Sequence, residues 1–211
     1  METTLVELDA LVAATFDLWE QEWVGFSWSR YFINHTRRVR ALALRLAAEA
    51  GADGEIVALA ATLHDITKRY DGEILRDDNG NRSVGADGLW RNEFLPPRGT
   101  NQVTRWVVER GLQGALHSDS GAIVAEALLD EAGFPTSLMT AVGACIRDHV
   151  RMKGHEGSNS SLEADVLYDA DTLDANMGLV AFYRNIMIHC YRTFCRDGRV
   201  DLARYISYIP S

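Results

Sequence analysis

A chain of 211 residues is long enough to bury a complete hydrophobic core, and it suits one domain or one domain with an insertion. The formal net charge of −9 argues against broad binding to nucleic acid polymers or anionic membranes, although a few local cations could still hold a small anion. The hydrophobic content of 47% is ordinary for a soluble globular protein.

The cysteines and the first residues indicate a cytoplasmic protein. The chain has an odd number of cysteines, namely Cys145, Cys190 and Cys195, and two of them fall in expected helices. We therefore expect buried thiols in a reducing compartment. The opening segment, METTLVELDALVAATFDLWEQEW, carries acids where a signal peptide needs basic residues. No apolar stretch reaches the length of about 18 residues that a membrane span requires, and we expect no membrane association.

Apolar residues recur at helical spacing from the beginning of the chain, and this pattern predicts an all-α fold. Residues 3–20 form the first expected helix. Asn34 is a candidate cap for the next helix, HTRRVRALALRLAAEAG, which ends at Gly51. The segment GEIVALAATLHDITKRY, residues 54–70, is the third expected helix and is rich in alanine and leucine.

A polar and irregular stretch follows the third helix. It includes RDDNGNRSVGADG and LPPRG, with one short helix expected at 101–111. Long segments without regular structure are usually functional or disordered. We therefore expect an irregular insertion, about residues 71–113, between the third helix and the helix that follows His117.

The remaining sequence is again helical. SDSGAIVAEALLDEAG has Ser118 or Ser120 as a candidate cap and Gly133 at its end, and PTSLMTAVGACIRDHV begins with a proline near its first turn. A loop rich in glycine and serine leads to one long helix over 162–194. With no convincing strand pattern, we expect one domain over residues 1–211, with a core of about 30–185.

Three histidines end apolar stripes on three different expected helices. Each of these histidines shares a helix face with small or apolar residues one and two turns away. These residues are Ala60 and Val57 for His64, Cys145 and Val142 for His149, and Val39 and Leu42 for His35. Neutral imidazole in a core needs partners, and a shared metal would satisfy several rings at once. Asp171 lies on a small-residue face, where a buried carboxylate is costly without a cation.

Each of these residues alone is more often a core or surface residue than a ligand, but their order along the chain is informative. The set His35, His64–Asp65, His117, His149 and Asp171 resembles the HD-domain superfamily of metal-dependent phosphohydrolases. LHDITK looks like the doublet that names the family, NHTRRVRALALRLA like its first histidine helix, and DADTLDA like its terminal aspartate motif. The resemblance runs from about residue 30 to residue 180 and implies an HD-type helical bundle.

The resemblance also implies a ligand set. His35, His64, Asp65 and Asp171 would bind one metal, and Asp65 would bridge to a second metal held by His117 and His149. Mixed imidazole and carboxylate ligands suit divalent transition metals; iron or manganese is favoured, and zinc, cobalt and nickel stay open. The insertion at 71–113 is longer than a compact HD domain needs, so the substrate does not carry over from the family.

The implied reaction is hydrolysis of a phosphoester or phosphoanhydride in a nucleotide or other small phosphorylated metabolite, through a metal-bridging hydroxide. The context of His117, LHSDSGA, resembles dinuclear members that act on dinucleoside polyphosphates. Asp65 and Lys68 are the expected catalytic residues, and Lys68 resembles the lysine that often follows the doublet. Further candidates for binding the substrate phosphate are Arg38, Arg147 and Arg151.

Two other functions stay open at this point. Some members of the superfamily use a similar ligand set to hold a di-iron centre that oxidises polyols or phosphonates. A non-catalytic sensor of metal or nucleotide is the third alternative, and it would usually show a lost ligand, which this chain does not. Homo-oligomer formation is also left open.

Overall fold

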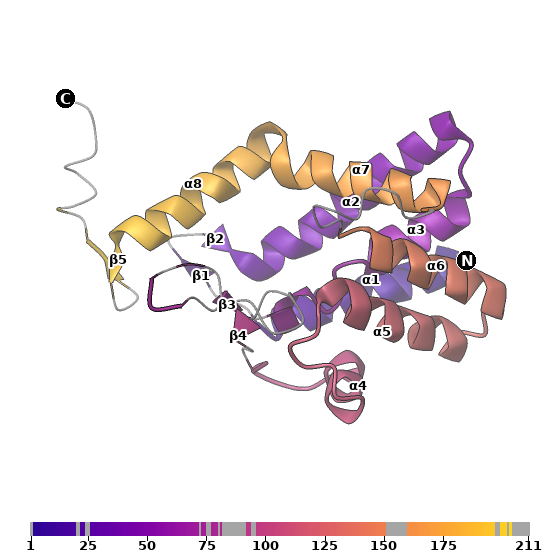
Figure 1. Ribbon diagram of the computed structural model, residues 1–211, viewed down its shortest axis with the longest axis horizontal. Helices are drawn as coiled ribbons and strands as arrows, with labels where there is room; N and C mark the ends of the chain where they lie inside the picture. The colour runs from indigo at the N-terminus through magenta and orange to yellow at the C-terminus, as the bar shows by residue number, and fades with distance from the viewer. Residues whose placement is uncertain are drawn as a thin grey trace. The chain divides into compact units, whose positions relative to one another are not determined.

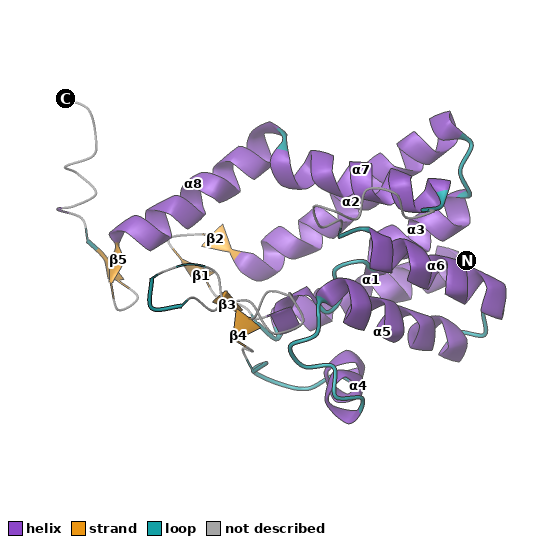
Figure 2. Ribbon diagram, in the orientation of Figure 1, coloured by secondary structure: helices purple, strands orange, loops and turns teal. Residues whose placement is uncertain are grey.

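The computed structural model describes residues 2–19, 22–23, 26–71, 73–74, 77–79, 81, 92–93, 96–150, 160–196, 199–201 and 203. Helices make up nearly all of its regular structure, and the all-α prediction is confirmed (Figure 2). The described helices are α1 (Glu2–Asp17), α2 (Trp28–Ala50), α3 (Gly54–Leu63), α4 (Gln102–Glu109), α5 (His117–Glu131), α6 (Thr136–Asp148), α7 (Leu162–Asn176) and α8 (Gly178–Phe194). A short 3₁₀ helix, η1 (Lys68–Asp71), follows α3.

The β structure within the described ranges consists of three antiparallel ladders with two residues in each strand. The ladders pair β1 (Glu22–Trp23) with β2 (Phe26–Ser27), β3 (Glu73–Ile74) with β4 (Asn92–Glu93), and β5 (Cys195–Arg196) with β6 (Arg199–Val200). The β3–β4 ladder and α4 both fall in the expected insertion at 71–113, of which residues 82–91 lie outside the described residues. α4 buries Val103 and Val107, so this part of the insertion contributes to the core.

The chain divides into two compact units, residues Met1–Asp171 and Thr172–Ser211, which we call unit 1 and unit 2. The prediction of one long helix over 162–194 is wrong, because two helices cover this range. α7 ends at Asn176, and α8 starts at Gly178 in unit 2. Gly178 has a φ of +85°, a left-handed conformation that interrupts a right-handed helix and that glycine adopts without strain. Arg184 in α8 donates a hydrogen bond to the carbonyl of Ala175 across this break.

α3 is the central helix of unit 1. Every residue from Val57 to Leu63 is buried, and α2, α6 and α1 all pack against this helix, while α5 lies alongside α6 (Figure 1). Three alanines in α3 let the neighbouring helices approach closely. Asp53 caps its first turn by accepting hydrogen bonds from the N–H groups of Glu55 and Ile56. The expected end of α2 at Gly51 is confirmed, with a φ of +76°.

Two expected helix starts are wrong. α2 begins at Trp28, because the hydroxyl of Ser27 accepts a hydrogen bond from the N–H of Arg30, and Asn34 lies inside the helix. Trp28 and Phe32 stack one turn apart and stabilise this extra length. α5 begins at His117 without a side-chain cap, since neither Ser118 nor Ser120 caps it.

The third expected helix is also shorter than the sequence indicated. α3 ends at Leu63, and residues 64–71 form tight turns in which the N–H groups of Ile66, Lys68 and Tyr70 each bind the carbonyl three residues back. Examples are Lys68 N–H to Asp65 at 2.8 Å and Tyr70 N–H to Thr67 at 2.8 Å. None of the described helices is both long and apolar enough to cross a membrane.

Shortening a side chain on the central helix should be costly. Leu59 is fully buried, so Leu59→Ala leaves a cavity and should lower the free energy of unfolding by about 2–5 kcal/mol. Leu44→Ala is the matched control on α2, because Leu44 is 40% exposed; its effect should stay below about 1 kcal/mol. Urea unfolding followed by circular dichroism measures both, and equal losses would contradict the central position of α3.

Candidate metal centre

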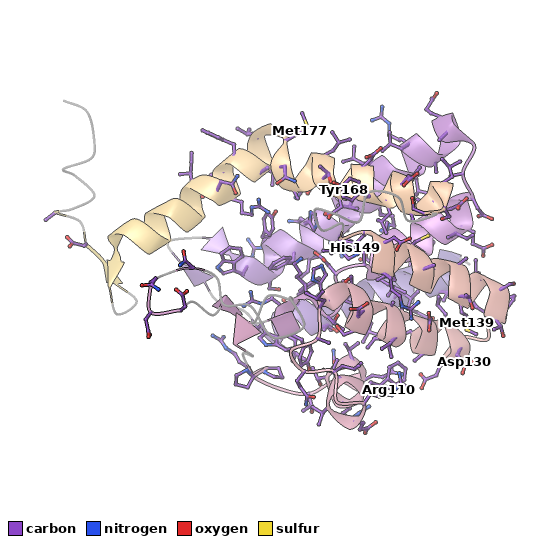
Figure 3. The ribbon with its side chains drawn as sticks, in the orientation of Figure 1. Arg110, Asp130, Met139, His149, Tyr168 and Met177 are labelled. Atoms are coloured by element: carbon purple, nitrogen blue, oxygen red, sulfur yellow. The ribbon has the colours of Figure 1, made fainter. Side chains whose placement is uncertain are left out.

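Four histidines and two aspartates from five segments of unit 1 converge on one place. They are His35 in α2, His64 and Asp65 directly after α3, His117 at the start of α5, His149 directly after α6, and Asp171 in α7. The histidines and Asp65 are buried, and the side chain of Asp171 is 24% exposed. Figure 3 shows His149 toward the middle of the bundle, whereas Arg110 and Asp130 lie at its margin.

The first group consists of His35, His64 and Asp171, together with Oδ2 of Asp65. Nε2 of His35 lies 3.1 Å from Oδ1 of Asp171 and 3.7 Å from Oδ2 of Asp65. Nε2 of His64 lies 3.9 Å and 3.6 Å from the same two oxygens. The ring of Tyr31 stacks parallel to His35, with 6.1 Å between centroids. One donor atom each from His35, His64 and Asp171 lies within 4.8 Å of the others, as ligands of a single ion would.

The second group consists of His117 and His149, together with Oδ1 of Asp65. Nε2 of His117 lies 3.3 Å from Oδ1 of Asp65, and Nε2 of His149 lies 3.7 Å from it. The two Nε2 atoms are 3.1 Å apart. Asp65 therefore turns one oxygen toward each group, a geometry in which a single carboxylate can contact two ions.

The hydrogen bonds of His64 and His149 show what these groups can bind. Nδ1 of His64 lies 2.9 Å from the carbonyl of Ala61, and Nδ1 of His149 lies 2.6 Å from that of Ile146. A carbonyl only accepts, so each Nδ1 carries the proton, and each ring in its neutral form presents the lone pair of Nε2 to the site. Nε2 of His64 is buried and has no hydrogen-bond partner among the described residues. Lone pairs facing carboxylates need a cation, and this donor set fits a divalent metal.

The electrostatics of the site favour the protonation states that metal binding requires. Burial lowers the pKa of His64 to about 4, although Asp65 and Asp171 partly oppose this shift. Burial disfavours the charged form of Asp65, but nearby positive charge, that of Lys68 above all, outweighs this effect and holds the pKa of the carboxyl well below its usual range. At neutral pH a neutral imidazole therefore lies beside an ionised carboxylate.

The four basic residues expected to bind phosphate lie in different places. Nζ of Lys68 lies 2.9 Å from Nε2 of His117 and 3.8 Å from Oδ1 of Asp65, inside the second group. Arg38 is half-buried on α2, one turn after His35. The guanidinium of Arg147 binds Glu126 on α5 at 2.9 Å, so the structure does not bring Arg147 to the histidines. Arg151 lies outside the described residues.

A buried pair of hydroxyls, which was missed in the sequence analysis, connects the turn after His64 and Asp65 to α5. Oγ1 of Thr67 donates to the carbonyl of His117 at 3.2 Å and lies 2.8 Å from Oγ of Ser120. A Cβ on Gly121 would lie 3.3 Å from the carbonyl oxygen of His64, so a larger residue would crowd this contact. The spacing of His117, Ser120 and Gly121, which puts all three on one helix face, was the available signal.

Comparisons with known proteins identify the fold. Residues 32–176 match the model of the HD domain family. The structure is similar to the crystal structure of a predicted HD superfamily hydrolase from an uncultured Thermotogales bacterium, with a TM-score of 0.52 and 24% identity over 95% of this chain and 84% of the other. At that identity the likeness concerns the fold alone. A search of curated proteins gave no significant match.

Removing the Thr67 hydroxyl should loosen the start of α5. Thr67→Val keeps the shape of the side chain but leaves the Ser120 hydroxyl without this buried partner, and it should lower the free energy of unfolding by about 1–3 kcal/mol. Thr67→Ser keeps the hydroxyl and should lose clearly less. Urea unfolding of the two variants measures the difference, and a Thr67→Val variant as stable as Thr67→Ser would contradict the role of this hydrogen bond.

Acidification should destabilise the metal-free protein. His64 titrates near 6.5 when unfolded and near 4 when folded, so between these values the unfolded chain binds more protons and stability falls as the pH falls. The slope from this residue is at most about 1.4 kcal/mol per pH unit. Thermal unfolding of chelator-treated protein at several pH values measures it, and His64→Gln should flatten the profile. An unchanged profile in that variant would argue against this assignment.

Proposed function

Because the chain belongs to the HD domain family, we propose that it is a metal-dependent phosphohydrolase acting on a nucleotide or another small phosphorylated metabolite. Family membership supports metal-dependent phosphohydrolase chemistry at the level of the superfamily, and the substrate is our proposal. The observation that carries it is Asp65, whose two carboxylate oxygens face two different groups of histidines.

We propose that the first group would hold one divalent ion and the second group another, with Asp65 shared between them. Imidazole nitrogens and carboxylate oxygens together suit first-row transition metals, among which we favour iron or manganese. When bound, such ions supply Lewis acidity, neutralise phosphate charge and lower the pKa of a water to yield a nucleophile. The chain would then need no serine or cysteine nucleophile.

The protein's own residues would orient these donors and receive the phosphate. The rings of His64 and His149 are held by the carbonyls of Ala61 and Ile146, so their Nε2 atoms are aimed before any ligand arrives. Asp65 fixes the spacing between the two groups. The Lys68 side chain is 34% exposed, and its ammonium can therefore contact an anionic substrate at the opening of the site.

A small substrate is consistent with the charge of the chain. At a net charge of −9, a polyanion would be repelled over most of its length, whereas a compact phosphate contacts only the local cations. The context of His117, LHSDSGA, resembles that of HD phosphatases acting on dinucleoside polyphosphates. This resemblance supports nucleotides as the first substrates to test.

Replacing the shared carboxylate should remove both metal binding and turnover. Asp65→Ala should lower phosphate release by at least about 100-fold and reduce the metal content measured by mass spectrometry, because both groups lose an oxygen ligand. Asp169→Ala is the matched control, since Asp169 is exposed on α7 only two residues from Asp171. A fully active Asp65→Ala variant would rule out the assigned site.

The substrate class is tested by a phosphate-release screen over nucleotides and dinucleoside polyphosphates, with the protein loaded with iron or manganese. Phosphate release from a subset of these compounds supports the proposal, and no phosphate release from any of them counts against it. Oxygen consumption by the reduced iron form with polyols or phosphonates would overturn the hydrolase in favour of the oxygenase.

A further inference from the structure

The second group already contains a positive charge from the chain itself. Nζ of Lys68 lies 2.9 Å from Nε2 and 3.4 Å from Nδ1 of His117, and 3.8 Å from Oδ1 of Asp65. An ammonium has hydrogen-bond donors only, so it donates to Nε2 of His117 in the tautomer in which Nε2 carries the lone pair, which is the tautomer that a metal ligand needs. That lone pair and Oδ1 of Asp65 are two of the three donors that this group offers to an ion. The lysine therefore occupies donors that a second ion would need.

The two groups differ in the charge that they present. The first group contains a whole carboxylate from Asp171 and Oδ2 of Asp65, with two imidazole rings. The second group contains two imidazole rings and Oδ1 of Asp65, and an ammonium within 4 Å opposes the arrival of another cation. A cation of the same charge should therefore bind the second group more weakly than the first.

The type of basic residue at this position supports the inference. Only two of the 21 basic residues in the sequence are lysines, Lys68 and Lys153; all others are arginines. A guanidinium is a broad planar fork, whereas an ammonium is a compact charge on a flexible stem. A compact charge fits among the donors of one ion better than a planar fork does, and its flexible stem lets it withdraw when an ion arrives. The partial exposure of Lys68, 34% of its side chain, leaves it a path toward solvent.

We infer that the ammonium of Lys68 and the second metal ion compete for the same place. The chain then has a one-metal form, with Lys68 in the second group, and a two-metal form, with Lys68 displaced toward the opening of the site. Since only the second ion must displace the lysine, it is the exchangeable one, and its occupancy follows the free metal concentration. This inference rests on the proposed metal-dependent function and concerns how many ions the site retains.

Manganese titration of the chelator-treated full chain tests the inference without any substrate. Free Mn²⁺ is followed by electron paramagnetic resonance and heat by calorimetry. We expect two classes of site in the wild type. Lys68→Met should tighten the weaker class by about tenfold or more, because the competing charge is gone, and leave the tighter class within about twofold. Arg105→Met, at an exposed position on α4, is the matched control and should leave both classes unchanged.

The displacement of Lys68 has its own readout. Acetylation by an amine reagent, followed by peptide mass spectrometry, reports the reactivity of Lys68, with the same protein without Mn²⁺ as the reference. We expect Lys68 to stay protected with no Mn²⁺ or with one equivalent, and to become more reactive when the weaker class fills. Reactivity that does not change as this class fills would overturn the inference.

The possible failures are distinguishable. Two bound ions with affinities that Lys68→Met leaves unchanged would overturn the competition but leave the proposed metal-dependent hydrolase standing. Equal affinities at the two sites in the wild type would likewise overturn it. A chain that binds no Mn²⁺, and no Fe²⁺ or Zn²⁺ when the titration is repeated with those ions, would overturn both the competition and the proposed function.

Discussion

Burial of the Asp65 carboxylate is the constraint on which the rest of unit 1 depends. A buried anion costs several kcal/mol unless positive charge compensates it. The rings of His64 and His149 do not provide that charge while they are neutral, since both turn lone pairs toward the site. Lys68 is the largest source of opposing positive charge, and a bound cation would add to it. Because the two oxygens of Asp65 face opposite groups, the fold must bring donors to both sides of one side chain.

The ends of helices place donors on both sides of Asp65. They also explain which parts of the fold could be predicted from the sequence. His64 and His149 each follow the last residue of a helix, where terminal carbonyls lack helical partners, and each ring binds the carbonyl three residues back. Hydrophobic spacing predicted the helices that carry these residues. It did not predict their starts and ends, because those depend on tertiary contacts, such as the aromatic packing that extends α2 back to Trp28.

For the site, the sequence predicted which residues meet but not how they are supported. Alignment with apolar residues one turn away indicated His35, His64 and His149, because a polar side chain in line with a buried stripe is itself buried. The direction of a long, exposed side chain has no such signal, and Arg147 binds Glu126 instead. Thr67 was missed because its partner, Ser120, lies 53 residues further along the chain and only the tertiary fold brings the two together.

The charge of the protein also bears on the order in which metal ions and a phosphate would bind. The chain has a net charge of −9, and the six candidate ligands include two carboxylates, so a phosphate would meet repulsion at a metal-free site. Nζ of Lys68 lies 2.9 Å from Nε2 of His117 and 3.8 Å from Oδ1 of Asp65, and these contacts leave less of its charge for a substrate. Under the proposed competition, a bound ion would reverse both effects, because it would add positive charge and displace the lysine. Substrate affinity should therefore follow metal occupancy, and phosphate would bind after the ions.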